Sequence, residues 1–144
     1  MPDLPWTTPT APHPDAEVHV MASRFETATL LGAVRFFLKA PGIIKQLRTA
    51  PGAHGAALRA RVLGRTFVTL SAWADPEALH RFARAEPHRT SARAAAAHTK
   101  EAVFTYWTAP ASALPIGWDE AERRLAEERS RRATGHGHGH GQSH

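Results

Sequence analysis

Apolar and polar residues alternate along four short stretches of the chain, which is the pattern of strands with one buried face. These stretches are residues 18–25, 57–62, 66–73 and 102–108. Between the first two, Leu30, Val34 and Leu38 recur at helical spacing, and between the last two Ala78 and Phe82 do the same. The pattern therefore predicts helical regions inserted among four strands.

The order of these elements is strand, helix, strand, strand, helix, strand. It predicts an α+β domain of the ferredoxin-like βαββαβ type, in which a four-stranded antiparallel sheet carries both helices on one face. Residues 75–77 (Asp-Pro-Glu) have the residue types of a helix start. We expect Pro41 to interrupt the first helix, Gly64 to form the turn of the central hairpin, and Pro87 to separate two helical pieces.

The strand predicted over residues 66–73 has apolar side chains on both faces. Val68 and Leu70 lie on one face, and Phe67 and Trp73 lie on the other. Such a strand is covered on both sides, whereas the two helices cover only one face of the sheet. We therefore expect a second copy of the chain to close the other face, giving a homodimer in the form of a dimeric α+β barrel.

The two ends of the chain differ from this central domain. Residues 1–17 contain five prolines and predict an extended or disordered arm, ahead of a domain over 18–109. Residues 110–132 predict a crossing segment and a highly charged helix with a thin apolar stripe. The Gly/His-rich tail over 133–144 is expected to be disordered.

The amino-acid composition excludes several classes of function. The chain has 42% apolar residues, 18 Lys and Arg against 13 Asp and Glu, and no cysteine, which excludes disulfides, Fe–S clusters and cysteine nucleophiles. Its arginines are scattered among elements of every type, so nucleic-acid binding is not expected. No apolar run is long enough for a membrane span, and the N-terminus lacks the order of a secretory signal. We expect a cytoplasmic protein with no membrane partner.

A longer motif resembles a known superfamily. It comprises residues 67–79 (FVTLSAWADPEAL), the Phe-Ala pair at 82–83 and the His-Arg pair at 88–89. This motif resembles the dimeric α/β-barrel proteins of the antibiotic biosynthesis monooxygenase-like superfamily. Within that superfamily it is similar to spheroidene monooxygenase-like and DUF3291-type proteins, and the resemblance spans about residues 18 to 125.

The resemblance implies a monooxygenase-like protein that acts on a hydrophobic small molecule. Its relatives include enzymes without a cofactor, haem-dependent enzymes and proteins of no known activity. It also implies a pocket between the sheet and the helices, close to Trp73 and His88.

His88 is the candidate catalytic and cofactor-binding residue. If a helix begins at Pro87, the helix dipole disfavours a protonated His88, which leaves a neutral ring able to ligate haem iron or accept a proton. The alternative is a histidine at a helix end, hydrogen-bonded to a loop carbonyl. The expected substrate pocket around it comprises Trp73, Phe82, Phe37, Ser91 and Ala92. For Trp73 the alternative is a place in the core.

Other histidines and the single tyrosine are weaker candidates. We expect no catalytic role for His19, His54, His80 or His98. Tyr106 suits sheet packing, with a haem ligand or general acid as the alternative. The tail histidines have a spacing that suits weak Zn²⁺ or Ni²⁺ binding, and they are His136, His138 and His140.

Two functions follow from these observations. The first is a monooxygenase-type oxidoreductase, either with haem held by His88 or with no cofactor. The second is a non-catalytic dimeric protein of the same fold that binds a small ligand.

Overall fold

The computed structural model describes residues 3–97 and 99–138. The chain forms five strands and four α-helices, with one short 3₁₀ helix, in these described residues. In order they are β1 (Asp3–Thr7), β2 (Glu17–Thr27), α1 (Leu30–Arg48), β3 (Ala53–Arg61), β4 (Thr66–Trp73), α2 (Pro76–Arg84), α3 (His88–Ala96), β5 (Thr99–Pro110), η1 (Ala111–Ala113) and α4 (Trp118–His138).

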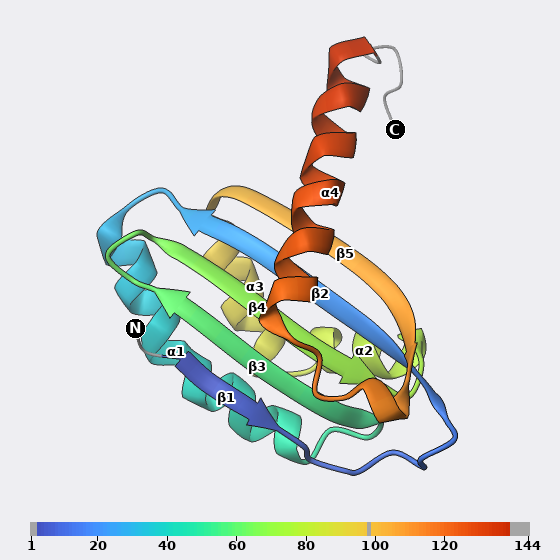
Figure 1. Cartoon of the computed structure of the whole chain (residues 1–144). Coiled ribbons are helices and arrows are strands. Elements are labelled where there is room, and N and C mark those ends of the chain that lie inside the picture. The colour runs from blue at the N-terminus through green and yellow to red at the C-terminus, as the bar shows by residue number, and fades with distance from the viewer. Residues whose placement is uncertain (1–2, 98, 139–144) are drawn as a thin grey trace.

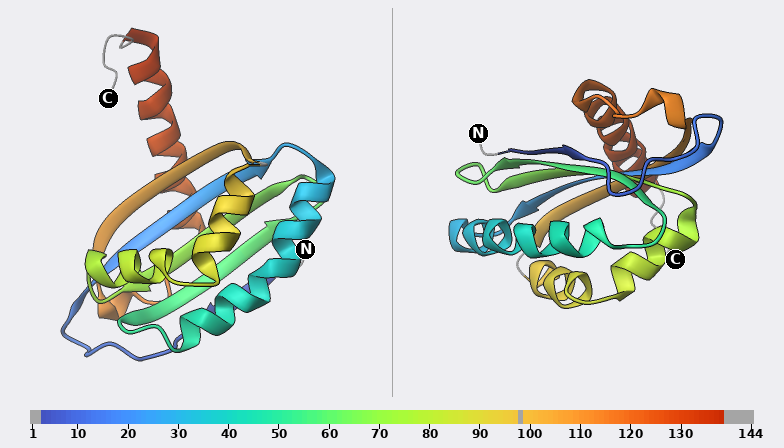
Figure 2. Two further views of the ribbon diagram at one scale, coloured as in Figure 1. Left: turned by 180° about the vertical axis from the view of Figure 1, so that it is seen from behind. Right: turned by 90° about the horizontal axis from the view of Figure 1, so that it is seen from below.

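The strands form one antiparallel sheet in the order β1-β3-β4-β2-β5. Helices α1, α2 and α3 cover one face of this sheet, and α4 crosses the opposite face (Figures 1 and 2). We call these the inner and outer faces. The central strands and the first helices follow the predicted ferredoxin-like order. None of the described helices is long and apolar enough to cross a membrane.

The prediction of a four-stranded sheet was wrong, because the N-terminal arm contributes a fifth strand. β1 pairs with β3, and Leu4 lies opposite Leu58. Pro5 is tolerated because β1 is an edge strand. The indole of Trp6 packs directly over Gly55, where a β-carbon would overlap the ring.

α1 continues through Pro41, where the sequence predicts an interruption. The Thr29 hydroxyl begins the helix by accepting the N–H of Gly32 at 3.0 Å. Ala40 and Leu47, on either side of the proline, are both buried. Packing on these two sides holds the helix together across the one missing backbone hydrogen bond.

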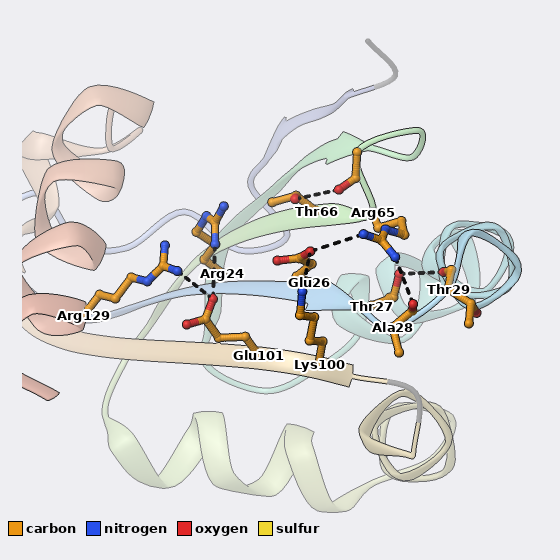
Figure 3. Close-up of polar contacts among 11 residues, drawn as sticks. Arg24, Glu26, Thr27, Ala28, Thr29, Arg65, Thr66, Lys100, Glu101 and Arg129 are labelled. Carbon is orange, nitrogen blue, oxygen red and sulfur yellow. Dashed lines mark hydrogen bonds and ion pairs between the residues drawn. The ribbon is translucent and has the colours of Figure 1, made fainter. Parts of the chain in front are cut away.

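The β3–β4 hairpin also turns differently from the prediction. Its left-handed residue is Arg65 (φ 57°) instead of Gly64. The Arg65 carbonyl accepts the N–H of Thr27 at 2.9 Å, and its guanidinium donates to the Ala28 carbonyl at 2.9 Å. Figure 3 shows the arginine side chain reaching back to this β2–α1 connection, where it also pairs with Glu26 at 3.6 Å. These contacts stabilise a conformation that a non-glycine residue seldom adopts.

The outer face of the sheet is covered by the chain itself. α4 and the segment before it place Ile116, Ala121 and Leu125 on this face. Beneath them lie the apolar residues of β2 and β4, which are Val18, Val20, Ala22, Val68, Leu70 and Ala72. The strand β4 is therefore covered on both sides, as predicted, but α4 supplies the cover that we expected from a second copy. The homodimer remains a prediction.

α4 extends to His138, past the helix end expected near Arg132. Its C-terminal part projects beyond the sheet (Figure 1). Arg129 pairs with Glu101 of β5 at 2.9 Å, and Arg132 donates to the Ala102 carbonyl at 3.0 Å. Once a helix is formed each further residue adds a hydrogen bond, which favours its continuation into the Gly/His-rich segment.

Candidate functional site

His88 is the first residue of α3 and follows the turn between α2 and α3. As predicted, Asp75 begins α2, where its side chain accepts the N–H of Ala78 at 2.9 Å. Pro87 lies between the two helices and gives α3 no side-chain cap. The start of α3 therefore needs a partner from elsewhere in the chain.

Gln46 of α1 supplies this partner. Its side-chain oxygen accepts the N–H of His88 at 2.8 Å, and its side-chain nitrogen donates to the Phe82 carbonyl at 3.1 Å. One amide thus binds the end of α2 and the start of α3 together. No local sequence pattern indicates this residue, because the contact joins positions 42 apart.

The His88 imidazole is half-buried and has a defined orientation. Its Nδ1 lies 3.3 Å from the Ala83 carbonyl, so Nδ1–H donates to that oxygen. Burial lowers the pKa of His88, and the bond to Ala83 opposes this only in part. The ring is therefore neutral at pH 7. Among the described residues Nε2 has no hydrogen-bond partner, so its lone pair is available to a ligand or a proton.

The His88 imidazole packs against an aromatic cluster of the core. The Phe82 ring lies 5.0 Å from the His88 ring and 5.1 Å from the Trp73 ring, measured between centroids. Trp73 is 1% exposed, and its Nε1 donates to the Ser71 hydroxyl at 2.9 Å. Trp73 and Phe82 are thus parts of the core that position His88.

The structure separates the other residues predicted for the pocket. Ser91 is half-buried and Ala92 is exposed on α3. Phe37 packs in a different cluster, around Leu58 and Phe67. It precedes Gln46 by nine residues of α1, which is about 14 Å along the helix axis. The structure therefore brings Trp73, Phe82 and His88 together, and it places Phe37 elsewhere.

A second group of polar and aromatic side chains lies beside this cluster on the inner face. In β2 it includes His19, Met21 and Ser23, and their partners in β5 and β4 are Thr108, Tyr106, Phe104, Trp73, Ser71 and Thr69. Met21 packs against the cluster that contains Trp73 and Phe82. Phe104 and Tyr106 remain 42% and 53% exposed. The inner face over β5 is therefore accessible from solvent and continuous with the His88 cluster.

His19 and Tyr106 form the polar part of this surface. Their rings are stacked with centroids 5.7 Å apart. Burial lowers the pKa of His19, the charge of nearby His80 lowers it further, and Asp75 acts in the opposite direction. A second neutral histidine therefore lies on the same face of the sheet as the His88 cluster. Sequence reasoning noted His19 and Tyr106 singly and missed their pairing, which depends on the β2–β5 register.

The predicted tail site lies largely outside the described residues. The backbone of α4 includes His136 and His138, but their side chains are not described, and His140 and His98 lie outside the described part of the chain. Among the residues that are described, no three His, Cys, Asp or Glu side chains group as metal ligands. Trp107 lies on the outer face, with the Arg124 guanidinium 4.3 Å from its ring.

Two cavities lie away from His88. One, of 340 Å³, is on the outer face between α4 and strands β2 and β5, and includes Arg24, Leu125 and Arg129. The other, of 300 Å³, lies under the N-terminal arm, beside Trp6 and His54. Neither is lined by residues of the His88 cluster.

The fold defines a class: ferredoxin-like α+β proteins with an antiparallel sheet. The family model for the domain of unknown function DUF3291 matches residues 27–143, so the chain belongs to that family. The resemblance to DUF3291-type proteins noted from the motif at residues 67–79 is confirmed. No protein of curated function matches the sequence significantly.

Solved structures share this fold at low sequence identity. A putative antibiotic biosynthesis monooxygenase from Nitrosomonas europaea has a TM-score of 0.56 and 14% identity, over 69% of this chain and 94% of that one. An antibiotic biosynthesis monooxygenase has a TM-score of 0.52 and 17% identity, over 64% of this chain and 95% of that one. An anthrone oxidase-like protein has a TM-score of 0.51 and 16% identity, over 74% of this chain and 54% of that one. At these identities the likeness establishes the fold.

Proposed function

We propose that this protein is a cofactor-independent monooxygenase-type enzyme, with His88 as the general base. The observation that carries the proposal is the free Nε2 of a neutral imidazole whose Nδ1–H is held by the Ala83 carbonyl. Such a ring can remove a proton only at Nε2, so the direction of proton transfer is set by the fold.

The proposed substrate is a hydrophobic molecule with an acidic C–H, such as the anthrone that the name of one structural neighbour suggests. His88 takes a proton from a CH₂ group, and the carbanion transfers an electron to O₂. The resulting radicals combine to a peroxide anion, which takes the proton back from His88. The hydroperoxide so formed loses water and leaves a carbonyl. One O₂ is consumed, with one oxygen atom in product and the other in water. Phe104 and Tyr106 offer exposed aromatic area for such a substrate.

The haem alternative uses the same nitrogen. His88 Nε2 would hold the haem iron, and haem would supply the activation of oxygen. The surroundings support haem less well, because the neighbouring Ala92 of α3 is exposed instead of lining an enclosed site. We therefore base the proposal on the neutral imidazole alone.

A non-catalytic ligand-binding protein is the second candidate. The contacts that favour it are those from Gln46 and Ala83, which give His88 a structural role in joining α2 to α3. In that case His88 stabilises the fold and the accessible inner face binds a ligand without turnover.

Oxygen uptake with an anthrone as probe tests the proposal. Wild-type protein is expected to accelerate uptake, and His88→Gln to abolish the acceleration while remaining folded. His54→Gln is the matched control and is expected to retain it, because the His54 imidazole bonds the Thr10 carbonyl away from this site. The absorption spectrum of purified protein and a haemin titration of wild type and His88→Ala test the alternative. Haemin binding with a Soret band in wild type alone would replace the cofactor-independent proposal by the haem one. Anthrone binding without oxygen uptake would support the non-catalytic protein.

We also propose that the chain forms a homodimer through the outer face. α4 projects beyond the sheet and carries residues of both signs, among them Arg123 and Glu127, so two antiparallel copies of α4 can match opposite charges. The 340 Å³ cavity between α4 and the sheet is lined in part by the exposed Ala126 and Ala133, which offer apolar area to a second copy. Sedimentation equilibrium is expected to give twice the chain mass, and a monomer at all concentrations would contradict it.

A further inference from the structure

The outward side of α1 carries an exposed apolar ridge. Leu31, Val34 and Leu38 are 59%, 38% and 70% exposed, and their spacing of three and four residues places them in one row along the helix. Leu30, at 47% exposure, flanks the row. Leu63, at the tip of the β3–β4 hairpin, is 85% exposed, and the contacts of Arg65 hold this hairpin beside the start of α1.

The same side of α1 is cationic. Arg35 and Lys45 lie in the row with the leucines, and Lys39 and Arg48 flank it; all four are exposed. α1 contains no acidic residue. None of these four cations forms an ion pair with another described residue.

The neighbouring helices add positive charge to this layer. Four further arginines of α2 and α3 are exposed and form no ion pair with another described residue. They are Arg81, Arg84, Arg89 and Arg93. The acidic groups near them are few: Asp75 caps α2, Glu77 lies in its first turn, and Glu86 follows its end. Arg89 and Arg93 help to lower the pKa of Glu86, after its hydrogen bond to Thr90. The helix layer therefore has a large surplus of cations.

The rest of the described surface is arranged differently. Its ion pairs lie on the sheet, the hairpin and α4, as between Arg59 and Glu122 at 2.7 Å. Figure 3 shows Glu101 between Arg24 and Arg129, and Glu26 between Arg65 and Lys100. Apart from Arg61, the described cations of the sheet, the hairpin and α4 are thus paired with acidic groups, whereas those on the side that exposes leucines are not.

We propose that the helix layer is a docking surface for an anionic lipid membrane, with the α1 ridge in contact with the bilayer. Leucines in one row can enter the boundary between headgroups and acyl chains, while cations in the same row meet lipid phosphates. This contact is peripheral, and it revises the expectation of no membrane partner, which rested on the lack of a spanning segment. It goes beyond the proposed enzymatic function and does not depend on it.

Two other occupants fit the surface less well. A second copy packed on the same face by two-fold symmetry would bring like charges together. A nucleic acid would use the cations, but it gains nothing from exposed leucines, and the row contains no exposed aromatic residue for base stacking.

Vesicle co-sedimentation tests the inference, with phosphatidylcholine alone and with equal parts of phosphatidylcholine and phosphatidylglycerol. Wild-type protein is expected to bind the anionic vesicles and to release as salt is raised. Replacing Arg35→Gln and Lys45→Gln together should weaken binding about 25-fold, at about five-fold per charge. Replacing Leu31→Gln and Leu38→Gln together should weaken it about 150-fold, at about twelve-fold for each inserted side chain that is lost.

The matched control is Arg123→Gln with Arg131→Gln, which removes the same charge from α4 on the opposite side. It is expected to change binding less than about two-fold. Thermal melting followed by circular dichroism checks that each variant is folded. Substitutions at these exposed positions should leave the fold intact. Three results would each overturn the proposal: no binding to anionic vesicles, an equal loss in the control, or full binding by the leucine variant with displacement by RNA. The last result would identify a polyanion site instead.

Discussion

The side-chain oxygen of Gln46 accepts the backbone N–H of His88 at 2.8 Å and thereby joins α1 to the first residue of α3. The same amide donates to the Phe82 carbonyl, so both helix ends next to the imidazole depend on one side chain. The candidate base is therefore positioned by a residue far from it in the sequence.

Replacing Gln46 by Ala should lower the free energy of unfolding by about 2 kcal/mol, because two partly buried backbone groups lose their partner. Urea denaturation measures this difference. Lys45→Ala, at the adjacent exposed position of α1, is the control and should change stability by less than about 0.5 kcal/mol. Equal effects of the two substitutions would show that the Gln46 bridge contributes nothing.

The close approach of Trp6 to Gly55 leads to a second prediction. Gly55→Ala should destabilise the protein by about 2 kcal/mol, because the added methyl group displaces the indole and loosens β1. Gly42→Ala is the matched control: no heavy atom lies within 4 Å of its added β-carbon, and a helical alanine should stabilise by about 0.5–1 kcal/mol. Thermal unfolding of the two variants should shift the melting temperature in opposite directions. A shift in the same direction would contradict the account of β1.

The cover of the outer face by α4 can be tested at Leu125, which is 2% exposed. Leu125→Ala should lower the free energy of unfolding by about 3 kcal/mol, since it leaves a cavity against the sheet. Leu38→Ala, at a position 70% exposed, should change it by less than about 0.5 kcal/mol. Chemical denaturation with both variants makes the comparison, and a small effect at Leu125 would mean that α4 does not pack on the sheet as described.

The sequence predicted those features that depend on nearby residues. Asp75 begins α2 because its side chain reaches an N–H three residues away. Pro87 separates α2 from α3 because a proline lacks the backbone N–H and disfavours a helical conformation in the residue before it. Both are local effects. They placed His88 correctly at the first turn of α3.

The features that the sequence did not reveal depend on tertiary contacts. β1 contains Pro5 and becomes a strand only because β3 offers a free edge. α1 passes Pro41 because the sheet packs on both of its halves. The Gln46–His88 contact and the His19–Tyr106 stack each join segments distant in the sequence. The cover of the outer face by α4 also depends on a tertiary contact. The few apolar residues of α4 are buried only because they pack against β2 and β4.

The lowered pKa of His88 predicts how stability depends on pH. In the folded protein the ring holds its proton less tightly than in the unfolded chain, where the pKa is about 6.5. Between the two pKa values the unfolded chain binds more protons, so the free energy of unfolding rises with pH through this window and is level above it. Stability should therefore fall as pH is lowered from about 7 towards 5.

His88→Gln should flatten this pH dependence, which urea denaturation at a series of pH values measures. His19→Gln is a separate comparison, because burial also lowers the pKa of that ring. An unchanged slope in His88→Gln would show that His88 is not the group responsible.

The state of the His88 imidazole is the most direct test of the account, because both the proposed base and the haem alternative require a free Nε2. Nitrogen-15 NMR of labelled protein distinguishes a protonated from an unprotonated ring nitrogen. We predict hydrogen on Nδ1, none on Nε2 at pH 7, and titration below the ordinary histidine pKa of about 6.5. Hydrogen on Nε2 instead, or titration at or above that value, would contradict the assignment of His88.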